Sequence, residues 1–278
     1  MENQNMKVIL ILLDGLGDRT YARLGHKTPL AAARTPSLDR IAAMGANGTY
    51  HALSPGRCLP SEMAHFLMFG YHPGEFPGRG LLEAAGGKVP FADSNVLVLA
   101  HLCRVGIDSN QRAFLEHGRD DIPGDRDFLS RFYKQISAYE YKNIDFRLHQ
   151  TGRNDAILAI SGNVSPDISD SDPVLEKSPI ARVMPLARTK EPDRAAKTAD
   201  ALNHYLAWCA DRLKELDAAP GAPRPALNPN FLVTQRSGRK KPIAGFGDKW
   251  GFSPAMIASG GVYQGLAMEL GFDFTRVQ

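Results

Sequence analysis

Residues 8–15 read Val-Ile-Leu-Ile-Leu-Leu-Asp-Gly, and this stretch decides the predicted fold. Residues 8–13 are apolar without interruption, whereas a strand that faces water on one side would alternate apolar and polar residues. A short unbroken run is typical of a strand buried on both faces, as in a parallel sheet. Asp14 and Gly15 then follow at the carboxyl end of the expected strand, where open α/β sheets bind their ligands.

A helix is predicted soon after this strand. Thr35 is a preferred N-cap residue, Pro36 suits the first helical position, and Gly45 would end the helix. Its expected buried stripe consists of Leu38, Ile41 and Ala42. Strand, loop and helix in this order predict the opening unit of a doubly wound sheet.

Four later segments have clear patterns. A second helix is expected from Ser61 to Phe69, with Gly70 closing it. Apolar residues recur at spacings of four and three between 195 and 216, which predicts a long amphipathic helix packed on the chain's own core. These residues are Ala195, Ala199, Leu202, Leu206, Cys209, Leu213 and Leu216. Residues 217–230, with four prolines, are expected to be a connector, and Phe231–Val233 a buried strand.

Two more short strands are expected at Val96–Leu99 and Ala156–Ile160, within a region of short apolar runs and polar loops. That texture predicts a smaller α+β domain at residues 91–189, inserted into a discontinuous core formed by residues 1–90 and 190–278. A last strand at Met256–Ala258 and a closing helix at Val262–Leu270 would complete the core.

Bulk composition excludes some function classes. The chain has 278 residues and a formal net charge of +3, a balance that argues for neither a nucleic-acid nor a membrane partner. Cys58, Cys103 and Cys209 are odd in number and show no metal-ligand spacing, so a reduced, cytoplasmic protein is expected. The apolar run 8–13 is too short for a signal segment or a membrane span.

Ser61 and Asp14 are the first candidate site residues. Ser61 follows Pro60 at the expected amino end of a helix, where unpaired N–H groups and the helix dipole favour a phosphate. The alternative is that Ser61 only caps the helix. Asp14 at a strand tip could ligate a metal, or it could only shape a turn with Gly15.

The chain resembles the archaeal-type cofactor-independent phosphoglycerate mutases of the alkaline phosphatase superfamily. The resemblance is strongest over the first 90 residues and returns at 246–252. Five motifs arrive in the family's order and spacing: residues 11–19 (ILLDGLGDR), 25–30 with 35–39 (GHKTPL, TPSLD), 60–65 (PSEMAH), 69–73 (FGYHP) and 78–84 (GRGLLEA).

The resemblance implies an α/β fold with an alkaline-phosphatase-like core and a parallel-rich sheet. It also implies that Ser61 is a nucleophile that forms a phosphoserine while 2- and 3-phosphoglycerate are interconverted in glycolysis. Asp14 and Ser61 would bind divalent metal, Mn²⁺ or Mg²⁺, with Zn²⁺ or Co²⁺ as alternatives. Metal would neutralise charge on the transferring group.

Three arginines are candidates for the substrate's anionic groups. Arg79 and Arg236 occupy motif positions, and their alternative is a structural role, such as pairing of Arg79 with Glu83. Arg153 could bind a phosphate or carboxylate bidentately, or it could form a surface salt bridge.

The sequence departs from the family at several positions. Leu99 stands where the family has an arginine, and Glu62 where it has an aspartate. The family's Asp-x-x-x-His and Asp-His metal-ligand pairs have no counterpart in the sequence up to Gln278. Asp200 and His204 have the first spacing, but they lie on the amphipathic helix, where residues four apart are usually just neighbours. We therefore expect an incomplete metal site and a poor mutase.

Two alternatives follow from these departures. One is a related metal-dependent phosphatase or phosphomutase that acts on another small phosphorylated metabolite. The other is a non-catalytic protein, or a subunit whose missing metal ligands come from a second chain.

Overall fold

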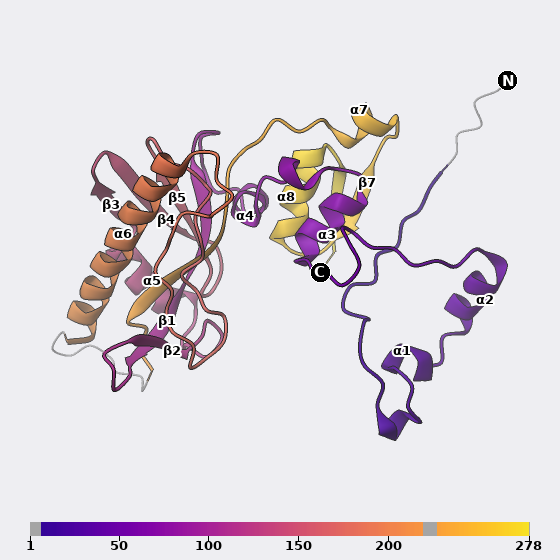
Figure 1. Cartoon of the computed structure of the whole chain (residues 1–278), viewed down its shortest axis with the longest axis horizontal. Helices are drawn as coiled ribbons and strands as arrows, with labels where there is room; N and C mark the ends of the chain where they lie inside the picture. Colours follow the sequence, from indigo (N-terminus) through magenta and orange to yellow (C-terminus); the bar gives the residue numbers. More distant parts are fainter. Residues whose placement is uncertain (1–6, 219–226, 278) are drawn as a thin grey trace. The chain divides into compact units, whose positions relative to one another are not determined.

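The computed structural model describes residues 7–218 and 227–277. The chain divides into two compact units, Met1–His65 and Phe66–Gln278, which are described separately (Figure 1). The predicted connector 217–230 falls largely on residues 219–226, outside the described residues. No described helix is both long enough and apolar enough to cross a membrane.

The first unit holds short helical segments joined by loops. These are the 3₁₀ turn η1 (Ala22–Leu24), α1 (Pro29–Ala32), α2 (Pro36–Met44) and the start of α3 (Ser61–Met68). The predicted bounds of α2 are confirmed, and Gly45 ends it as expected. Helix α3 begins at Ser61 as predicted and ends at Met68, one residue before the predicted end. The predicted buried stripe of α2 is wrong, because Leu38 and Ile41 are exposed.

The predicted strand at residues 8–13 is also wrong. The structure has no strand there, and every side chain of the run is exposed, from Leu12 at 37% to Ile9 at 83%. A strand needs a hydrogen-bonded neighbour, and no described segment pairs with this run. The apolar composition of the run indicates that it can be buried. It does not indicate which other segment would pair with the run or cover it.

The second unit is built on a six-stranded antiparallel sheet, ordered β2-β1-β5-β4-β3, with β6 paired to β1. The strands are β1 (Val96–Ile107), β2 (Ala113–His117), β3 (Ala138–Tyr141), β4 (Ile144–Gln150), β5 (Ala156–Ser161) and β6 (Phe231–Gly238). The predicted strands at 96–99, 156–160 and 231–233 are confirmed as parts of β1, β5 and β6.

The expected parallel-rich sheet is not confirmed, because all the pairings within this sheet are antiparallel. Five of its strands come from the predicted inserted domain 91–189 and one, β6, from the predicted core. The division into a core of residues 1–90 plus 190–278 and an inserted domain of residues 91–189 therefore stays a prediction. In that division both domains contribute strands to the same sheet.

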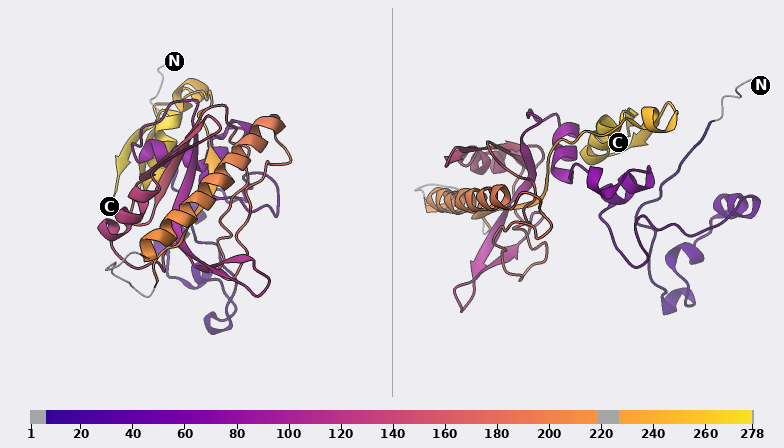
Figure 2. Two further views of the ribbon diagram at one scale, coloured as in Figure 1. Left: turned by 90° about the vertical axis from the view of Figure 1, so that its left-hand side faces the viewer. Right: turned by 45° about the horizontal axis from the view of Figure 1, so that its top comes forward.

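Helices α5 (Arg126–Gln135) and α6 (Pro192–Ala218) pack with the sheet strands to form the main core (Figures 1 and 2). The predicted amphipathic stripe of α6 is confirmed, since its residues from Ala195 to Leu213 are almost wholly buried. Asp200 and His204 lie on α6 as exposed neighbours, and His204 hydrogen-bonds Tyr141.

Helix α4 (Arg79–Gly86) packs on β1 and β6 and also against α8 (Gly261–Leu270). The two helices approach so closely that a Cβ on Gly265 would overlap the carbonyl of Leu82. Around α8 lie β7 (Ala255–Ala258) and β8 (Asp273–Arg276), a parallel pair, with α7 (Phe246–Trp250) before them. The predicted last strand and closing helix are confirmed as β7 and α8.

Candidate active site

Ser61 and Asp14 both lie in the first unit. Ser61 is the first residue of α3, and the carbonyl of Pro60 accepts hydrogen bonds from the N–H groups of Met63 and Ala64. The predicted position at a helix amino end is therefore confirmed. Ser61 lies at the positive end of the α3 dipole.

Asp14 is exposed in a turn with Gly15, whose φ of 74° is the left-handed conformation that glycine tolerates. Since residues 8–13 form no strand, the expectation that Asp14 sits at a strand end is wrong. Neighbouring residues line an open surface hollow of ≈ 420 Å³, among them Leu13, Gly15 and Asp18. None of the hydrogen bonds between described residues joins Asp14 to Ser61, so their convergence stays a prediction.

Arg79 and Arg236 lie together in the second unit, where the amino end of α4 meets the end of β6. Gly80, next to Arg79, is so close to β1 and β6 that a Cβ there would overlap the Leu97 carbonyl and make a tight contact with that of Arg236. The Arg79 guanidinium binds Glu83 Oε1 at 3.0 Å, as the structural alternative predicted. The substrate-binding role of both arginines remains a prediction.

The backbone at Arg236 is strained. Its φ is 56°, a conformation that costs a non-glycine residue free energy and that clusters at functional sites. Its N–H donates to Asp170 Oδ1 at 2.6 Å. Burial raises the pKa of Asp170 above its ordinary value, although this hydrogen bond and the charge of Arg236 oppose the shift.

The segment 169–173 (Ser-Asp-Ser-Asp-Pro) runs beside β6. Ser171 exchanges hydrogen bonds with Thr234, and Asp172 N–H donates to the Thr234 carbonyl. The Asp172 carboxylate faces His101 of β1, with Oδ2 and Nε2 3.5 Å apart and both side chains buried.

His101 and Asp172 form a buried polar pair that sequence reasoning missed. Burial lowers the pKa of His101 below its usual value of 6.5, although the Asp172 charge opposes this shift. Burial also raises the pKa of the nearby Cys103 thiol, so Cys103 stays protonated. The available signal was a histidine within the otherwise apolar run 96–103.

Arg153 is held by main-chain oxygens. Its guanidinium donates to the carbonyls of Ile122 (2.7 Å) and Gly124 (3.1 Å), and also to that of Arg119. The next residue, Asn154, accepts a hydrogen bond from the Leu102 N–H of β1. Arg236 instead follows Gln235, which pairs with Leu99 of β1, three residues before Leu102. Arg153 is therefore fixed at a different level of the sheet from Arg79 and Arg236.

Two further cations follow β6. Lys241 Nζ donates to the Gly74 carbonyl at 2.9 Å, and Arg239 Nη2 donates to the Val164 carbonyl. Burial lowers the pKa of both side chains. Partly desolvated cations of this kind suit an anionic ligand.

Among residues 7–218 and 227–277, three side chains of metal-ligating types come together: His117, Asp121 and Glu176. Neither Asp14 nor Ser61 belongs to this group. The structure therefore leaves the predicted metal role of Asp14 and Ser61 as a prediction.

Comparison with known proteins decides the family. The family model described as 2,3-bisphosphoglycerate-independent phosphoglycerate mutase matches residues 42–218. The chain belongs to this family. It is 33% identical to "2,3-bisphosphoglycerate-independent phosphoglycerate mutase 2" of Methanocaldococcus jannaschii, over 98% of this chain and 65% of the relative. The corresponding Thermoplasma volcanium protein is 32% identical, over 95% of this chain and 63% of the relative.

Solved structures agree with this assignment. A cofactor-independent phosphoglycerate mutase from Thermoplasma acidophilum is 26% identical with a TM-score of 0.52, covering 96% of this chain and 69% of that protein. A protein from Pyrococcus horikoshii shares the fold with a TM-score of 0.65 at 22% identity, covering 95% of this chain and 59% of that protein. The chain thus spans about two thirds of the length of the curated relatives it matches.

Proposed function

We propose that this chain carries out phosphoryl transfer of the phosphoglycerate mutase type through a phosphoserine at Ser61. Membership of the mutase family supports the reaction class, and the position of Ser61 at the amino end of α3 supports the residue. The unpaired N–H groups of the first helical turn offer hydrogen bonds to phosphate oxygens. Interconversion of 2- and 3-phosphoglycerate is the proposed overall reaction.

The proposed reaction is two transfers in sequence. Ser61 Oγ attacks the phosphorus of the bound phosphoglycerate, a new Oγ–P bond forms, and the bond from phosphorus to the substrate oxygen breaks. The serine proton leaves, and the departing substrate oxygen gains one. The neighbouring hydroxyl of the same glycerate then attacks the phosphoserine, which releases the other isomer and restores Ser61.

Asp14 and Ser61 fit a hard divalent cation, Mn²⁺ or Mg²⁺, because both offer oxygen donors. Among the ion pairs of the described residues, none engages Asp14 with a lysine or arginine. A bound ion would neutralise charge on the transferring group. With only two protein ligands we expect a weakly held ion and slow turnover by the chain alone. A second chain that supplied further ligands would raise both the affinity for the ion and the rate.

Arg79 and Arg236 are proposed to bind the substrate's anionic groups from the junction of α4 and β6. Arg153 is the third proposed anion-binding residue, although its contacts with loop carbonyls also give it a structural role. A cytoplasmic location is the accompanying proposal, resting on the cysteine pattern.

A second candidate is phosphatase or phosphomutase activity on another phosphorylated metabolite. The observation that favours it is Leu99, which stands where the family resemblance expects an arginine. In the structure Leu99 pairs with Ile157 and Gln235 in the sheet and offers no charge to an anion.

The test incubates the purified chain with Mn²⁺ and 3-phosphoglycerate and measures both 2-phosphoglycerate and inorganic phosphate. Isomer formation that Ser61→Ala abolishes supports the mutase, and phosphate release that it abolishes supports the phosphatase. Ser37→Ala is the matched control, because Ser37 also follows a proline at a helix start. Product formation by Ser61→Ala equal to that of the unmodified chain would refute the proposal.

A further inference from the structure

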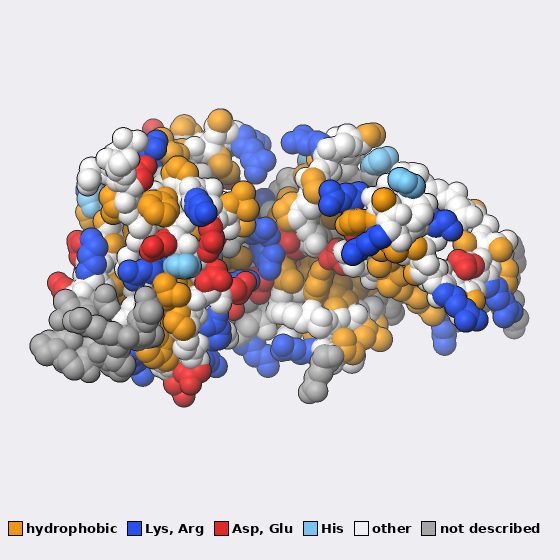
Figure 3. Space-filling view, turned by 90° about the horizontal axis from the view of Figure 1, so that it is seen from below, with side chains coloured by type: hydrophobic (Ala, Val, Ile, Leu, Met, Phe, Trp, Pro, Cys, Tyr) orange, Lys and Arg blue, Asp and Glu red, His pale blue; other side chains and the backbone are white. Residues whose placement is uncertain are grey.

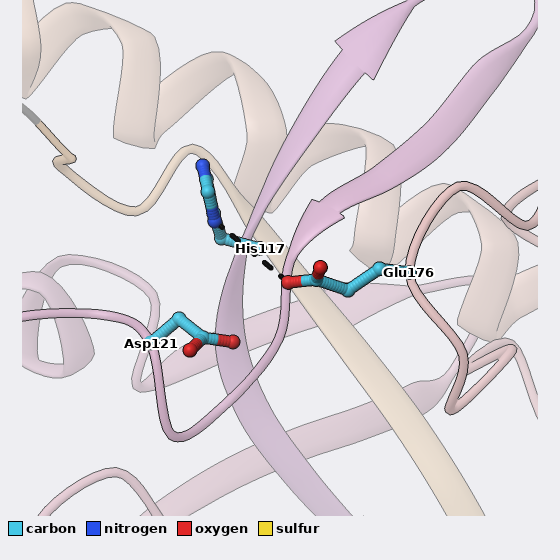
Figure 4. A group of neighbouring side chains, drawn as sticks. All are labelled: His117, Asp121 and Glu176. Atoms are coloured by element: carbon cyan, nitrogen blue, oxygen red, sulfur yellow. Dashed lines mark ion pairs between the residues drawn. The ribbon is translucent and has the colours of Figure 1, made fainter.

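We propose that His117, Asp121 and Glu176 form a binding site for one divalent transition-metal ion, such as Mn²⁺ or Zn²⁺. His117 ends β2, Asp121 lies in the turn that follows, and Glu176 comes from the loop after the segment 169–173 (Figure 4). One ligand atom from each residue lies within 4.8 Å of the other two. The ion would join segments far apart in the sequence.

The separation of His117 and Glu176 suits an ion between them. His117 Nδ1 and Glu176 Oε1 are 3.7 Å apart, which is too long for a hydrogen bond. Two donors that each lie about 2.0–2.2 Å from one metal ion are roughly 3 to 4 Å from each other. In Figure 4 the Glu176 and Asp121 carboxylates lie beside His117, and the dashed line joins the His117 ring to the Glu176 carboxylate.

The backbone holds the histidine and the glutamate opposite each other. Leu115 of β2 donates its N–H to the Ser178 carbonyl at 3.0 Å and accepts the Lys177 N–H at 2.7 Å. These two bonds fix the register between β2 and the loop that carries Glu176. Asp121 is placed by the turn in which its N–H donates to the Gly118 carbonyl.

Within the described part of the chain, the two carboxylates of this group have no lysine or arginine partner. Among the ion pairs of the described residues, neither Asp121 nor Glu176 meets a lysine or arginine within 4 Å. Two arginines of this region have other carboxylate partners: Arg119 binds Asp155 at 2.9 Å, and Arg104 binds Glu116 at 3.0 Å. A divalent cation would balance the two carboxylates.

The donor set indicates which metal class fits. Imidazole nitrogen with two carboxylate oxygens suits Zn²⁺ and Mn²⁺, whereas Ca²⁺ and Mg²⁺ favour oxygen donors throughout. The imidazole also distinguishes this group from an ordinary patch of surface carboxylates. Asp121 and Glu176 are exposed and His117 is half-buried, so water could complete the coordination. Figure 3 shows acidic side chains and histidines among the exposed groups on one face of the molecule.

The test uses the full chain with Asp14→Ala and Ser61→Ala, so that the proposed catalytic residues cannot hold the ion. Binding of Mn²⁺ is followed by electron paramagnetic resonance of the free ion. We expect one bound ion, and we expect His117→Ala or Asp121→Asn to weaken its binding at least about tenfold. Asp120→Asn, the adjacent exposed carboxylate, is the matched control and should leave binding unchanged.

A second readout is thermal. Mn²⁺ should raise the Tm of the double variant and of its Asp120→Asn form, and it should leave the Tm of the His117→Ala form unchanged. Absence of binding by the double variant would overturn the proposal, as would equal affinity of the His117→Ala and Asp120→Asn forms. Because Ser61 is already replaced, either result is independent of the proposed phosphoryl transfer.

Discussion

At the scale of single residues, His101 makes stability depend on pH. Its pKa is lowered by burial, so the folded chain favours the neutral imidazole. Below pH 6.5 the unfolded chain binds this proton while the folded chain resists it. The free energy of unfolding should therefore fall as pH drops, by up to about 1.4 kcal/mol per pH unit from this group.

Urea unfolding of the unmodified chain and His101→Gln between pH 5 and pH 7.5 checks this. The variant should lose part of the slope below pH 6.5, and the exposed His51→Gln should keep it. A slope that is the same in all three proteins would contradict the burial of His101 as a neutral group.

Asn154 is the other residue whose removal should be costly. Its side chain is buried and makes hydrogen bonds to Leu102 N–H and carbonyl, to Tyr133 Oη and to the Arg119 carbonyl. Asn154→Ala should lower the free energy of unfolding by about 3 kcal/mol, because buried polar groups lose their partners. Denaturant unfolding measures this, with the exposed Asn47→Ala as control. A loss no larger than that of the control would show that these bonds are not formed in solution.

Sequence reasoning reached local side-chain contacts and missed distant ones. The pairing of Arg79 with Glu83 was foreseen as an alternative because residues one helical turn apart are neighbours. The facing of His101 and Asp172 depends on how β1 and the segment 169–173 meet across β6. Nothing in the local sequence of either residue specifies that meeting.

At the scale of elements, the contact between α4 and α8 should tolerate no side chain. A Cβ on Gly265 would overlap the Leu82 carbonyl, so Gly265→Ala must push the helices apart. We expect a loss of about 2 kcal/mol or more in unfolding free energy and a lower Tm. Gly48→Ala is the control, since its Cβ would meet no atom within 4 Å. A Tm equal to that of the control would mean that α4 and α8 do not pack this closely.

Elements with their own periodicity were predictable. The apolar residues of α6 recur at spacings of three and four in the sequence. The structure confirms that they are buried, and the helix extends only a few residues beyond the predicted pattern at each end. Whether a strand pairs parallel or antiparallel could not be predicted in this way, because it depends on which segment lies alongside it. The apolar run 8–13 was expected to be a buried parallel strand, yet it has no partner among the described residues. The sheet of the second unit pairs antiparallel throughout.

At the scale of the whole molecule, the central claim is that Ser61 accepts the phosphoryl group. The family assignment supports the reaction class, while the chain's own contribution is a serine at a helix amino end. Neither turnover nor metal binding reports directly which atom carries the phosphoryl group. The covalent state of Ser61 does.

The most direct measurement is peptide mapping by mass spectrometry after the chain is mixed with Mn²⁺ and 3-phosphoglycerate and quenched in acid. We expect one phosphoryl group on the peptide that contains Ser61, none on Ser37, and none in the Ser61→Ala variant. Turnover of 3-phosphoglycerate with no phosphate on Ser61, or with phosphate on another residue, would contradict the account.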